Sequence, residues 1–245
     1  MKTKVLVVTG DGINCERESA RAFQEAGGES TILHINTLLE KPEILRNHQI
    51  FCLPGGFSFG DELRSGKILA EKIRVALLSE FQEFTHQGGL TIGICNGFQI
   101  LIQLGAFSEL HAKRESTLAT NDHGTFQDRW TEVEISTDAQ TSPWFQGMSG
   151  RLMLPIRHKE GRIVKSPGSE NRMRFPLRYS EAVNGSVEQS AAILDPSGRI
   201  LGLMPHPEAA TYAFLNPTLA TNEQKEENAK RVRRLFENAI LGAKQ

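Results

Sequence analysis

Residues 90–101 read Leu-Thr-Ile-Gly-Ile-Cys-Asn-Gly-Phe-Gln-Ile-Leu, a strand pattern followed at once by a helix pattern. The first five residues form a short apolar, β-branched run, which is typical of a buried strand. An amphipathic helical pattern starts directly after Cys95, so the chain must turn sharply at that residue. Gly93 and Gly97 remove the side chains that would crowd so tight a turn. We therefore predict a strand that turns into a helix with Cys95 at the corner.

A residue at such a corner stands above the end of the sheet, beside the N-terminus of a helix. The positive end of the helix dipole favours the thiolate, which is the reactive form of cysteine. Cys95 is therefore a candidate nucleophile. Free cysteine is also commonly a small buried apolar residue, and the local sequence leaves both interpretations open.

The bulk composition is that of an ordinary globular protein. The chain has 245 residues, enough for one large α/β domain, and we expect residues 1–245 to form a single domain. The formal net charge is -1, which gives no overall field to attract nucleic acid or an anionic membrane. No run approaches the roughly 18 apolar residues of a membrane-spanning helix. The short apolar run near the N-terminus lacks the features of a signal peptide.

The three cysteines, Cys15, Cys52 and Cys95, lie far apart in the chain. Their odd number and wide spacing favour free thiols in a reducing cytoplasm over a disulfide framework. No His/Cys group has the spacing of a zinc site, so we expect no metal in this chain. Residues 60–67 superficially suggest a phosphate loop, but the spacing is one residue too long and Ile68 stands where a magnesium-binding Ser or Thr belongs.

Strand patterns alternate with helix patterns over the first hundred residues, which predicts βαβ units and a parallel sheet. Asn14 is a plausible N-cap for the first helix. We expect an α/β fold with a doubly wound, mostly parallel sheet and helices on both faces, and ligands beyond the carboxyl ends of the strands. The predicted strands cover 4–9, 30–35, 49–53 and 90–94, and the predicted helices cover 15–26, 66–87 and 96–105.

The second half of the chain carries short strand patterns separated by Gly, Pro and Asn. We expect antiparallel additions to the sheet and long loops in this region. A last amphipathic helix begins near Thr221, because Thr221 and Gln224 have the spacing of a capping box. The predicted strands cover 132–135, 151–155, 161–165, 177–179, 191–194 and 200–204.

A cysteine nucleophile needs a base, and the base needs an orienting group. His206 also follows a predicted strand, so we expect it at the same sheet edge as Cys95. Pro207 favours an extended conformation at His206, which would bring Glu208 to the same side as the imidazole. A carboxylate there would fix the tautomer and stabilise the imidazolium. Without Cys95, Pro-His-Pro-Glu would favour a surface turn with a satisfied histidine.

The loop Pro-Gly-Gly-Phe-Ser at residues 54–58 follows the third predicted strand. Attack on an amide carbonyl creates an oxyanion, which backbone N–H groups can hold. The N–H of Gly56 and that of Asn96, directly after the candidate nucleophile, could form such a pair. By itself the loop is also an ordinary turn.

Three motifs in this order, at 54–58, 93–99 and 205–208, resemble the triad-type (class I) glutamine amidotransferases. Their combination is far more specific than any one motif. Finer similarities to the glutaminase subunits of phosphoribosylformylglycinamidine synthase extend over nearly the whole chain. These similarities cover residues 12–16, 55–64, 95–101, 155–161, 184–186 and 202–208.

The resemblance implies an amidotransferase-like fold in which Cys95 is the nucleophile, His206 the general base and then acid, and Glu208 its partner. Glutamine would be hydrolysed through a cysteine thioester. The ammonia would pass to a synthetase subunit, which uses ATP and magnesium to convert formylglycinamide ribonucleotide to the amidine in purine biosynthesis. No cofactor is then expected in this chain itself.

The resemblance also suggests the glutamine pocket and the partners. Gln99 and the turn at Phe57 and Ser58 are our candidates for shaping that pocket. Segments 121–130 and 142–148 look more like the large, single-chain synthases. The docking mode, and the need for a small bridging subunit, therefore stay open.

His158 is a rival base, because Glu160 follows it with the same two-residue offset. Spacing does not separate the two pairs, and only the resemblance selects His206. Cys15 lies in a matched motif, and we expect a structural thiol there. Two other functions stay open: an amidotransferase or γ-glutamyl hydrolase with a different acceptor, and a non-catalytic glutamine-sensing or scaffold subunit. The intact set of triad residues argues against the second.

Overall fold

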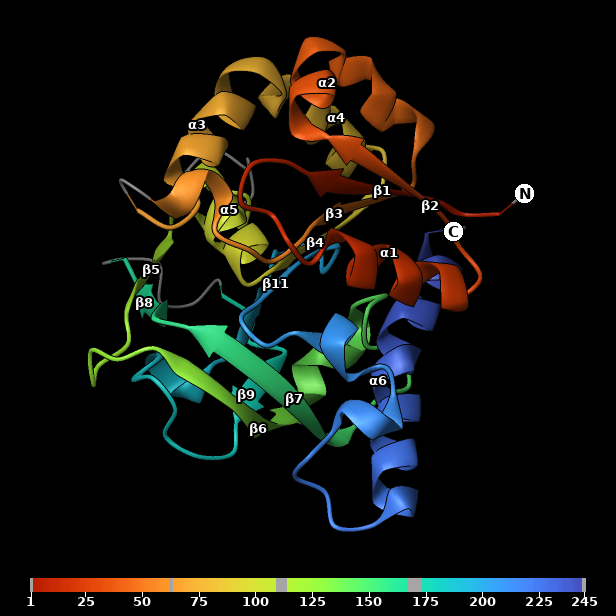
Figure 1. Ribbon diagram of the computed structural model, residues 1–245. Helices are drawn as coiled ribbons and strands as arrows, with labels where there is room; N and C mark the ends of the chain where they lie inside the picture. The colour runs from red at the N-terminus through yellow and green to blue at the C-terminus, as the bar shows by residue number, and fades with distance from the viewer. Residues whose placement is uncertain (1, 62–63, 109–113, 167–172, 244–245) are drawn as a thin grey trace.

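The computed structural model describes residues 2–61, 64–108, 114–166 and 173–243. A six-stranded sheet lies at its centre (Figure 1). Its strands are β1 (Lys4–Thr9), β2 (Glu29–His34), β3 (Ile50–Leu53), β4 (Leu90–Ile94), β10 (Ala192–Leu194) and β11 (Ile200–Leu203). They lie in the order β10-β11-β4-β3-β1-β2, and all pairs are parallel except β10 with β11.

Helices cover both faces of this sheet (Figure 1). On one side lie α2 (Ile35–Glu40), α3 (Lys67–Ala76) and α4 (Leu78–His86), and α5 (Asn96–Leu104) packs between α3 and β4. On the other side lie α1 (Glu16–Glu25) and α6 (Asn222–Gly242), where the rings of Phe23 and Phe236 meet edge-on at 5.0 Å. The central strands β3, β4 and β11 are buried at every residue, as strands covered on both faces must be. The predicted doubly wound α/β fold is confirmed.

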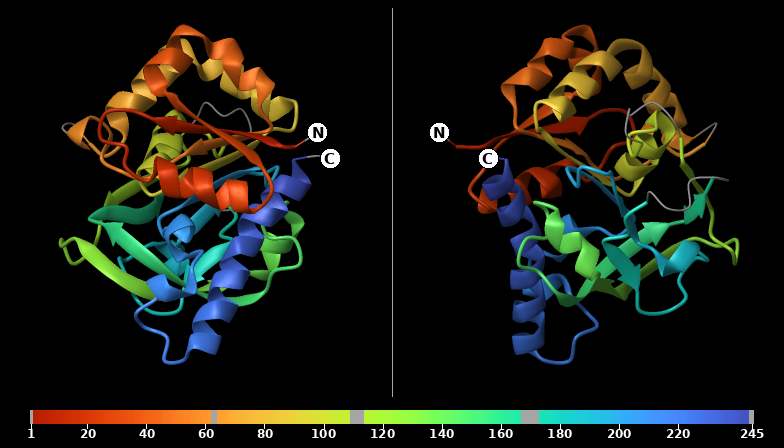
Figure 2. Two further views of the ribbon diagram at one scale, coloured as in Figure 1. Left: turned by 45° about the vertical axis from the view of Figure 1, so that its right-hand side comes forward. Right: turned by 180° about the vertical axis from the view of Figure 1, so that it is seen from behind.

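A second layer of strands lies below the main sheet in Figure 1. One antiparallel sheet, in the order β7-β6-β9, contains β6 (Gln127–Ile135), β7 (Gly150–His158) and β9 (Leu177–Tyr179). A second pairs β5 (Ser116–Thr120) with β8 (Glu160–Lys165). Figure 2 shows α6 running from the edge of the main sheet along this layer, and α6 contacts both α1 and β7. The main sheet takes β10 as its antiparallel addition, while β5 to β9 form these separate sheets.

Several element boundaries differ from the sequence prediction. The strands predicted at 132–135 and 151–155 are parts of the nine-residue β6 and β7, whose full pairing brings polar residues into the ladder. The helix predicted over 66–87 is two helices, because the chain bends at the buried Leu77 (φ -126°, ψ -12°). The second helix brings Phe81 and Phe84 against Phe51 of β3, with ring centroids 6.2 and 6.4 Å away.

Of the two predicted helix N-caps, the one for α1 is wrong and the one for α6 is correct. Asn14 does not cap α1; Cys15 occupies the N-cap position, and its thiol donates to Asn14 Oδ1 at 3.3 Å. Thr221 caps α6 as predicted, since its hydroxyl accepts from the Gln224 N–H at 3.1 Å and the Gln224 side chain accepts from the Thr221 N–H at 3.2 Å. None of the helices in the described ranges combines the length and the apolarity needed to cross a bilayer.

Candidate active site

Cys95 lies at the corner between β4 and α5, in a strained backbone conformation (φ 50°, ψ -103°) that residues with a side chain rarely adopt. Its N–H donates to the Leu203 carbonyl at 2.8 Å, which ties the corner to β11. The two flanking glycines are required sterically. A Cβ at Gly97 would lie 1.8 Å from the Leu53 carbonyl oxygen, and one at Gly93 would lie 2.7 Å from the Gly97 backbone. The predicted strand, corner and helix are therefore confirmed.

His206 follows β11 and reaches the same sheet edge. Its N–H donates to the Pro155 carbonyl at 2.9 Å, which anchors it to β7. Its Nδ1 lies 2.6 Å from Glu208 Oε1, and both side chains are buried. Because a carboxylate only accepts, Nδ1 carries the hydrogen and Nε2 is left for chemistry. Nε2 has no hydrogen-bond partner among the described residues.

The His206–Glu208 contact forms over a turn, and this corrects one step of the sequence argument. Glu208 lies in a short 3-10 helix, Pro207–Ala210, that begins directly after His206. The two side chains therefore meet because the chain curls back on itself. Continued extended backbone is not what brings them to one side.

The charge state of His206 depends on its neighbours. Burial by itself lowers the pKa of an imidazole, but the Glu208 carboxylate and the neighbouring thiols of Cys95 and Cys15 together outweigh burial. The pKa of His206 is consequently raised well above its usual value. An imidazolium beside a thiol favours the thiolate, so the geometry suits a cysteine–histidine ion pair.

A cavity of about 410 Å³ opens next to the thiol. The Cys95 Sγ faces the Arg157 carbonyl oxygen at 3.6 Å across this cavity wall. The size suits a small amino acid, and the wall mixes charged, polar and aromatic groups. It is lined by Gly56, Phe57, Asp61, Ser65, Cys95, Gln99, Thr120, Phe126, Arg157, His158, Lys159 and Glu160.

The proposed oxyanion groups flank the same space. Gly56 lines the cavity with φ +148°, and a Cβ there would lie 2.4 Å from the Gly12 carbonyl oxygen. The Asn96 N–H belongs to the first turn of α5, where N–H groups have no carbonyl partner within the helix. Both backbone positions are therefore available where the prediction needs them.

The candidate pocket residues fall into two groups. Phe57 and Gln99 line the cavity, whereas Ser58 is buried beside it and its N–H donates to Asn96 Oδ1 at 3.2 Å. The Gln99 side chain is held at both ends, because its Nε2 donates to the Glu160 carbonyl at 2.5 Å and its Oε1 accepts from Asn96 Nδ2 at 2.9 Å. Gln99 therefore shapes the cavity wall, and Ser58 supports the wall from behind.

Charged residues that the sequence argument missed also line the cavity. Asp61 and Glu160 supply carboxylates, and burial raises the pKa of each. Arg157 and Lys159 also line the cavity; the Arg157 carbonyl faces the Cys95 thiol, while its guanidinium lies 3.8 Å from the Asp128 carboxylate. The two carboxylates fit the α-ammonium group of an amino acid. The motif similarities at 55–64 and 155–161 include these residues and could have pointed to them.

The rival base pair is not formed. His158 Nδ1 lies 3.2 Å from Asn121 Oδ1, while the Glu160 carboxylate lies 3.6 Å from the Arg64 Nε. Burial, followed by the charge of His206, lowers the pKa of His158 to about 4. So weak a base is poorly suited to deprotonate a thiol, and the geometry favours His206.

Cys15 lies close to the candidate triad of Cys95, His206 and Glu208. Its thiol, a His206 ring nitrogen and a Glu208 oxygen all lie within 4.8 Å of one another. Sulfur, imidazole and carboxylate are donors that zinc accepts, and the set comes from two distant segments that no sequence spacing connects. The 2.6 Å bond between His206 and Glu208 already orients the imidazole, so we assign these two residues to the candidate triad with Cys95, and Cys15 lies beside that triad.

Comparison with known proteins agrees with this geometry. The family model described as CobB/CobQ-like glutamine amidotransferase domain matches residues 2–241. The phosphoribosylformylglycinamidine synthase subunit PurQ of Dehalococcoides mccartyi is 36% identical over 256 residues, covering 100% of this chain and 99% of that protein. The corresponding PurQ subunit of Thermotoga maritima is 35% identical over 217 residues, covering 88% of this chain and 92% of that protein.

Solved structures point the same way. A chain in the structure of PurLQS from Thermotoga maritima superposes with a TM-score of 0.79 at 31% identity, and the match covers 100% of both chains. A glutamine amidotransferase from the same organism has a TM-score of 0.63 at 17% identity, and the match covers 100% of both chains. The second similarity shows the fold alone.

Proposed function

The chain belongs to the family of CobB/CobQ-like glutamine amidotransferases, and we propose that it acts as the glutaminase subunit of a phosphoribosylformylglycinamidine synthase. The observation that carries the proposed site is the strained Cys95 in the cavity wall together with the buried His206–Glu208 pair, whose imidazole pKa the nearby Cys95 thiol helps to raise. We propose that residues 1–245 act as one amidotransferase domain.

The first chemical step is attack of Cys95 Sγ on the carboxamide carbon of glutamine. His206 takes the thiol proton at Nε2, while Glu208 holds the imidazolium through Nδ1. The carbonyl oxygen becomes an oxyanion, and the N–H groups of Gly56 and Asn96 hold it. His206 then donates its proton to the amide nitrogen, the C–N bond breaks and ammonia leaves.

The second step hydrolyses the γ-glutamyl thioester on Cys95. Neutral His206 now accepts a proton from water, and the resulting hydroxide attacks the thioester carbon. The C–S bond breaks, glutamate is released and the thiol regains a proton. The bond to Glu208 suits both roles, because it keeps the hydrogen on Nδ1 in the neutral ring and stabilises the imidazolium when Nε2 is protonated.

The cavity wall supplies partners for the two α-groups of glutamine. Asp61 and Glu160 are our candidates for binding the α-ammonium, and Lys159, which lines the same cavity, is our candidate for the α-carboxylate. Gln99 keeps the wall in shape through its two hydrogen bonds. Glutamine is therefore held by its charged end, with the carboxamide toward the thiol.

Ammonia would pass to a separate synthetase subunit, which binds ATP and magnesium and converts formylglycinamide ribonucleotide to the amidine. The similar solved structure is of PurLQS, which supports a synthetase partner and a small bridging subunit. We expect the enzyme to work in the reducing cytoplasm, which fits its three free cysteines.

Covalent trapping tests this proposal. The chain is incubated with a glutamine analogue that carries an electrophilic carbon at the amide position, and the adduct is mapped by peptide mass spectrometry. We expect one adduct on Cys95 that excess glutamine blocks. An adduct on Cys15 or Cys52 would overturn the site assignment. Absence of any adduct, also with the synthetase partner present, would overturn the glutaminase function.

A further inference from the structure

His158 is a buried histidine in the active-site wall that the mechanism above does not use. It ends β7, lines the same cavity as Cys95, and is 3% exposed. Its Nε2 is shielded from water and has no hydrogen-bond partner among the described residues. The Nε2 of His206 is in the same condition, so both rings at this site hold an unsatisfied nitrogen. An unpaired buried polar atom is costly, which suggests that a ligand satisfies it.

The hydrogen bonds of Asn121 fix which nitrogen of His158 carries the proton. Asn121 Nδ2 donates to the carbonyls of Thr125 and His158, both at 3.0 Å, so the amide cannot be flipped without losing both bonds. Its Oδ1 therefore faces His158 Nδ1, at 3.2 Å. An oxygen there requires the hydrogen on Nδ1. Nε2 is consequently a bare lone pair, able to accept and unable to donate.

Both the position and the charge of this ring are fixed. Gly161 packs so closely under the ring that a Cβ there would lie 2.6 Å from His158 Nδ1. Burial, and then the charge of His206, lowers the pKa of His158 to about 4, so the ring stays neutral near pH 7. The site therefore holds a permanent neutral acceptor.

The surroundings indicate which substrate group meets this acceptor. The residue before it, Arg157, presents its carbonyl oxygen 3.6 Å from the Cys95 Sγ, so this end of β7 borders the reacting carboxamide. The α-ammonium of glutamine has the better partners Asp61 and Glu160 in the same wall. The remaining N–H donor of glutamine is its carboxamide nitrogen.

We propose that His158 Nε2 accepts a hydrogen bond from the carboxamide N–H of bound glutamine, and thereby selects an amide over a carboxylate at this position. The inference rests on the proposed glutaminase function. A glutamate oxygen would turn its own lone pairs toward Nε2, so the same atom disfavours the product. A site built to satisfy a donor discriminates strongly against an analogue that lacks it.

The test compares two substrates that differ in this donor. Glutamine and the γ-methyl ester of glutamate are hydrolysed by the complex of the chain with its synthetase partner, in the wild type and in His158→Phe. Phenylalanine keeps a planar ring and removes the acceptor. We expect kcat/KM for glutamine to fall about ten- to a hundredfold, and kcat/KM for the ester to change less than threefold. Inhibition by glutamate should become tighter.

Two further variants serve as controls. His158→Gln places an amide oxygen near the position of Nε2 and should restore at least part of the preference for amide over ester. His48→Phe removes another partly buried histidine, whose Nδ1 contacts the Ile44 carbonyl at 2.9 Å far from the site, and should leave both substrates unaffected.

The outcomes are distinct. Equal losses for amide and ester in His158→Phe, with no recovery in His158→Gln, would mean a merely structural ring and would overturn the inference while the glutaminase function stands. A wild-type complex that hydrolyses neither substrate and forms no Cys95 adduct would overturn the glutaminase function itself.

Discussion

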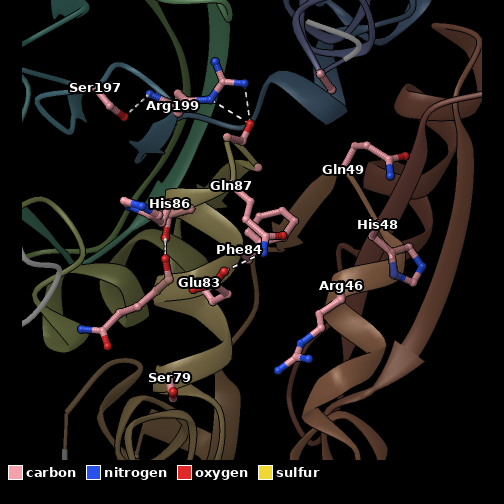
Figure 3. Close-up of a pocket in the computed structure, with 15 residues that line it drawn as sticks. Arg46, His48, Gln49, Ser79, Glu83, Phe84, His86, Gln87, Ser197 and Arg199 are labelled. Carbon is pink, nitrogen blue, oxygen red and sulfur yellow. Dashed lines mark hydrogen bonds between the residues drawn. The ribbon is translucent and has the colours of Figure 1, made fainter.

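Two cavities lie at opposite ends of the main sheet, and the larger one is not at the proposed site. The cavity in Figure 3 has a volume of about 1110 Å³, against about 410 Å³ for the cavity beside Cys95. Gln49, Gly89 and Arg199, which line the larger cavity, directly precede β3, β4 and β11. It therefore lies at the amino ends of the strands, whereas Cys95 follows β4 at the carboxyl end.

The two cavities differ in how far their polar groups are already paired. In the larger one, Arg46 pairs with Glu80 at 2.6 Å. Figure 3 shows the Arg199 side chain, which donates to the Gly88 carbonyl at 2.8 Å. The smaller one holds the strained thiol and the unsatisfied Nε2 of His158. An active site is identified by reactive groups that meet at the carboxyl ends of parallel strands. The volume of a cavity does not by itself identify one.

The largest effect should come from Cys95→Ala. We expect glutamine-dependent synthesis by the reconstituted complex to fall by at least about 10⁵-fold, because the nucleophile is lost, while synthesis from ammonium survives. The matched control is Cys52→Ala, which removes a cysteine buried inside β3 and should leave activity intact. Loss of both activities in a complex that still assembles would contradict the proposed division of labour.

Glu208→Gln should lower glutaminase kcat by roughly 10³- to 10⁴-fold with little change in KM, because the amide no longer stabilises the imidazolium. Glu83→Gln changes a carboxylate in the wall of the larger cavity and should have no effect on kcat. Steady-state ammonia release measures both variants. Equal kcat values for Glu208→Gln and Glu83→Gln would contradict the assignment of the reaction to the smaller cavity.

The stability of the folded chain should fall at acidic pH because His158 is buried in its neutral form. Its pKa is about 4 in the folded chain and about 6.5 when unfolded, so the unfolded chain binds more protons between these values. Above pH 6.5 the ring is neutral in both states, and the chain has its full stability. As the pH falls from 6.5 toward 4, protonation of the unfolded chain lowers the free energy of unfolding by about 3 kcal/mol. Urea unfolding at several pH values should show wild type losing that much more stability than His158→Gln. Parallel pH profiles would show that the ring titrates normally.

Arg199→Ala should have the smallest effect on function. It removes the hydrogen bond to Gly88 at the amino ends of the strands, which should cost about 1 kcal/mol of stability. Glutaminase activity should stay within about twofold of wild type. A large loss of kcat without unfolding, measured alongside urea denaturation, would show that the larger cavity takes part in the reaction.

The triad segments were readable from the sequence because each lies in a strongly local pattern. Apolar residues run into Cys95, and the flanking glycines fit a corner that has no space for a Cβ. The break at Leu77 could not be read, since aromatic packing against β3 redirects a continuous helical pattern. The separate sheets of the second layer were missed because polar side chains enter the long pairing of β6 and β7.

The sequence by itself determined the parallel α/β sheet and the corner at Cys95, because local periodicity and backbone sterics carry that information, and it left His206 and His158 as two candidate bases. Tertiary structure alone decided which histidine meets a carboxylate. His158 and Glu160 are two residues apart in sequence, but His158 ends β7 and Glu160 begins β8. The His158 ring therefore bonds to Asn121 and not to the Glu160 carboxylate. Which atoms meet across segments distant in sequence depends on packing between layers, and no local pattern contains it.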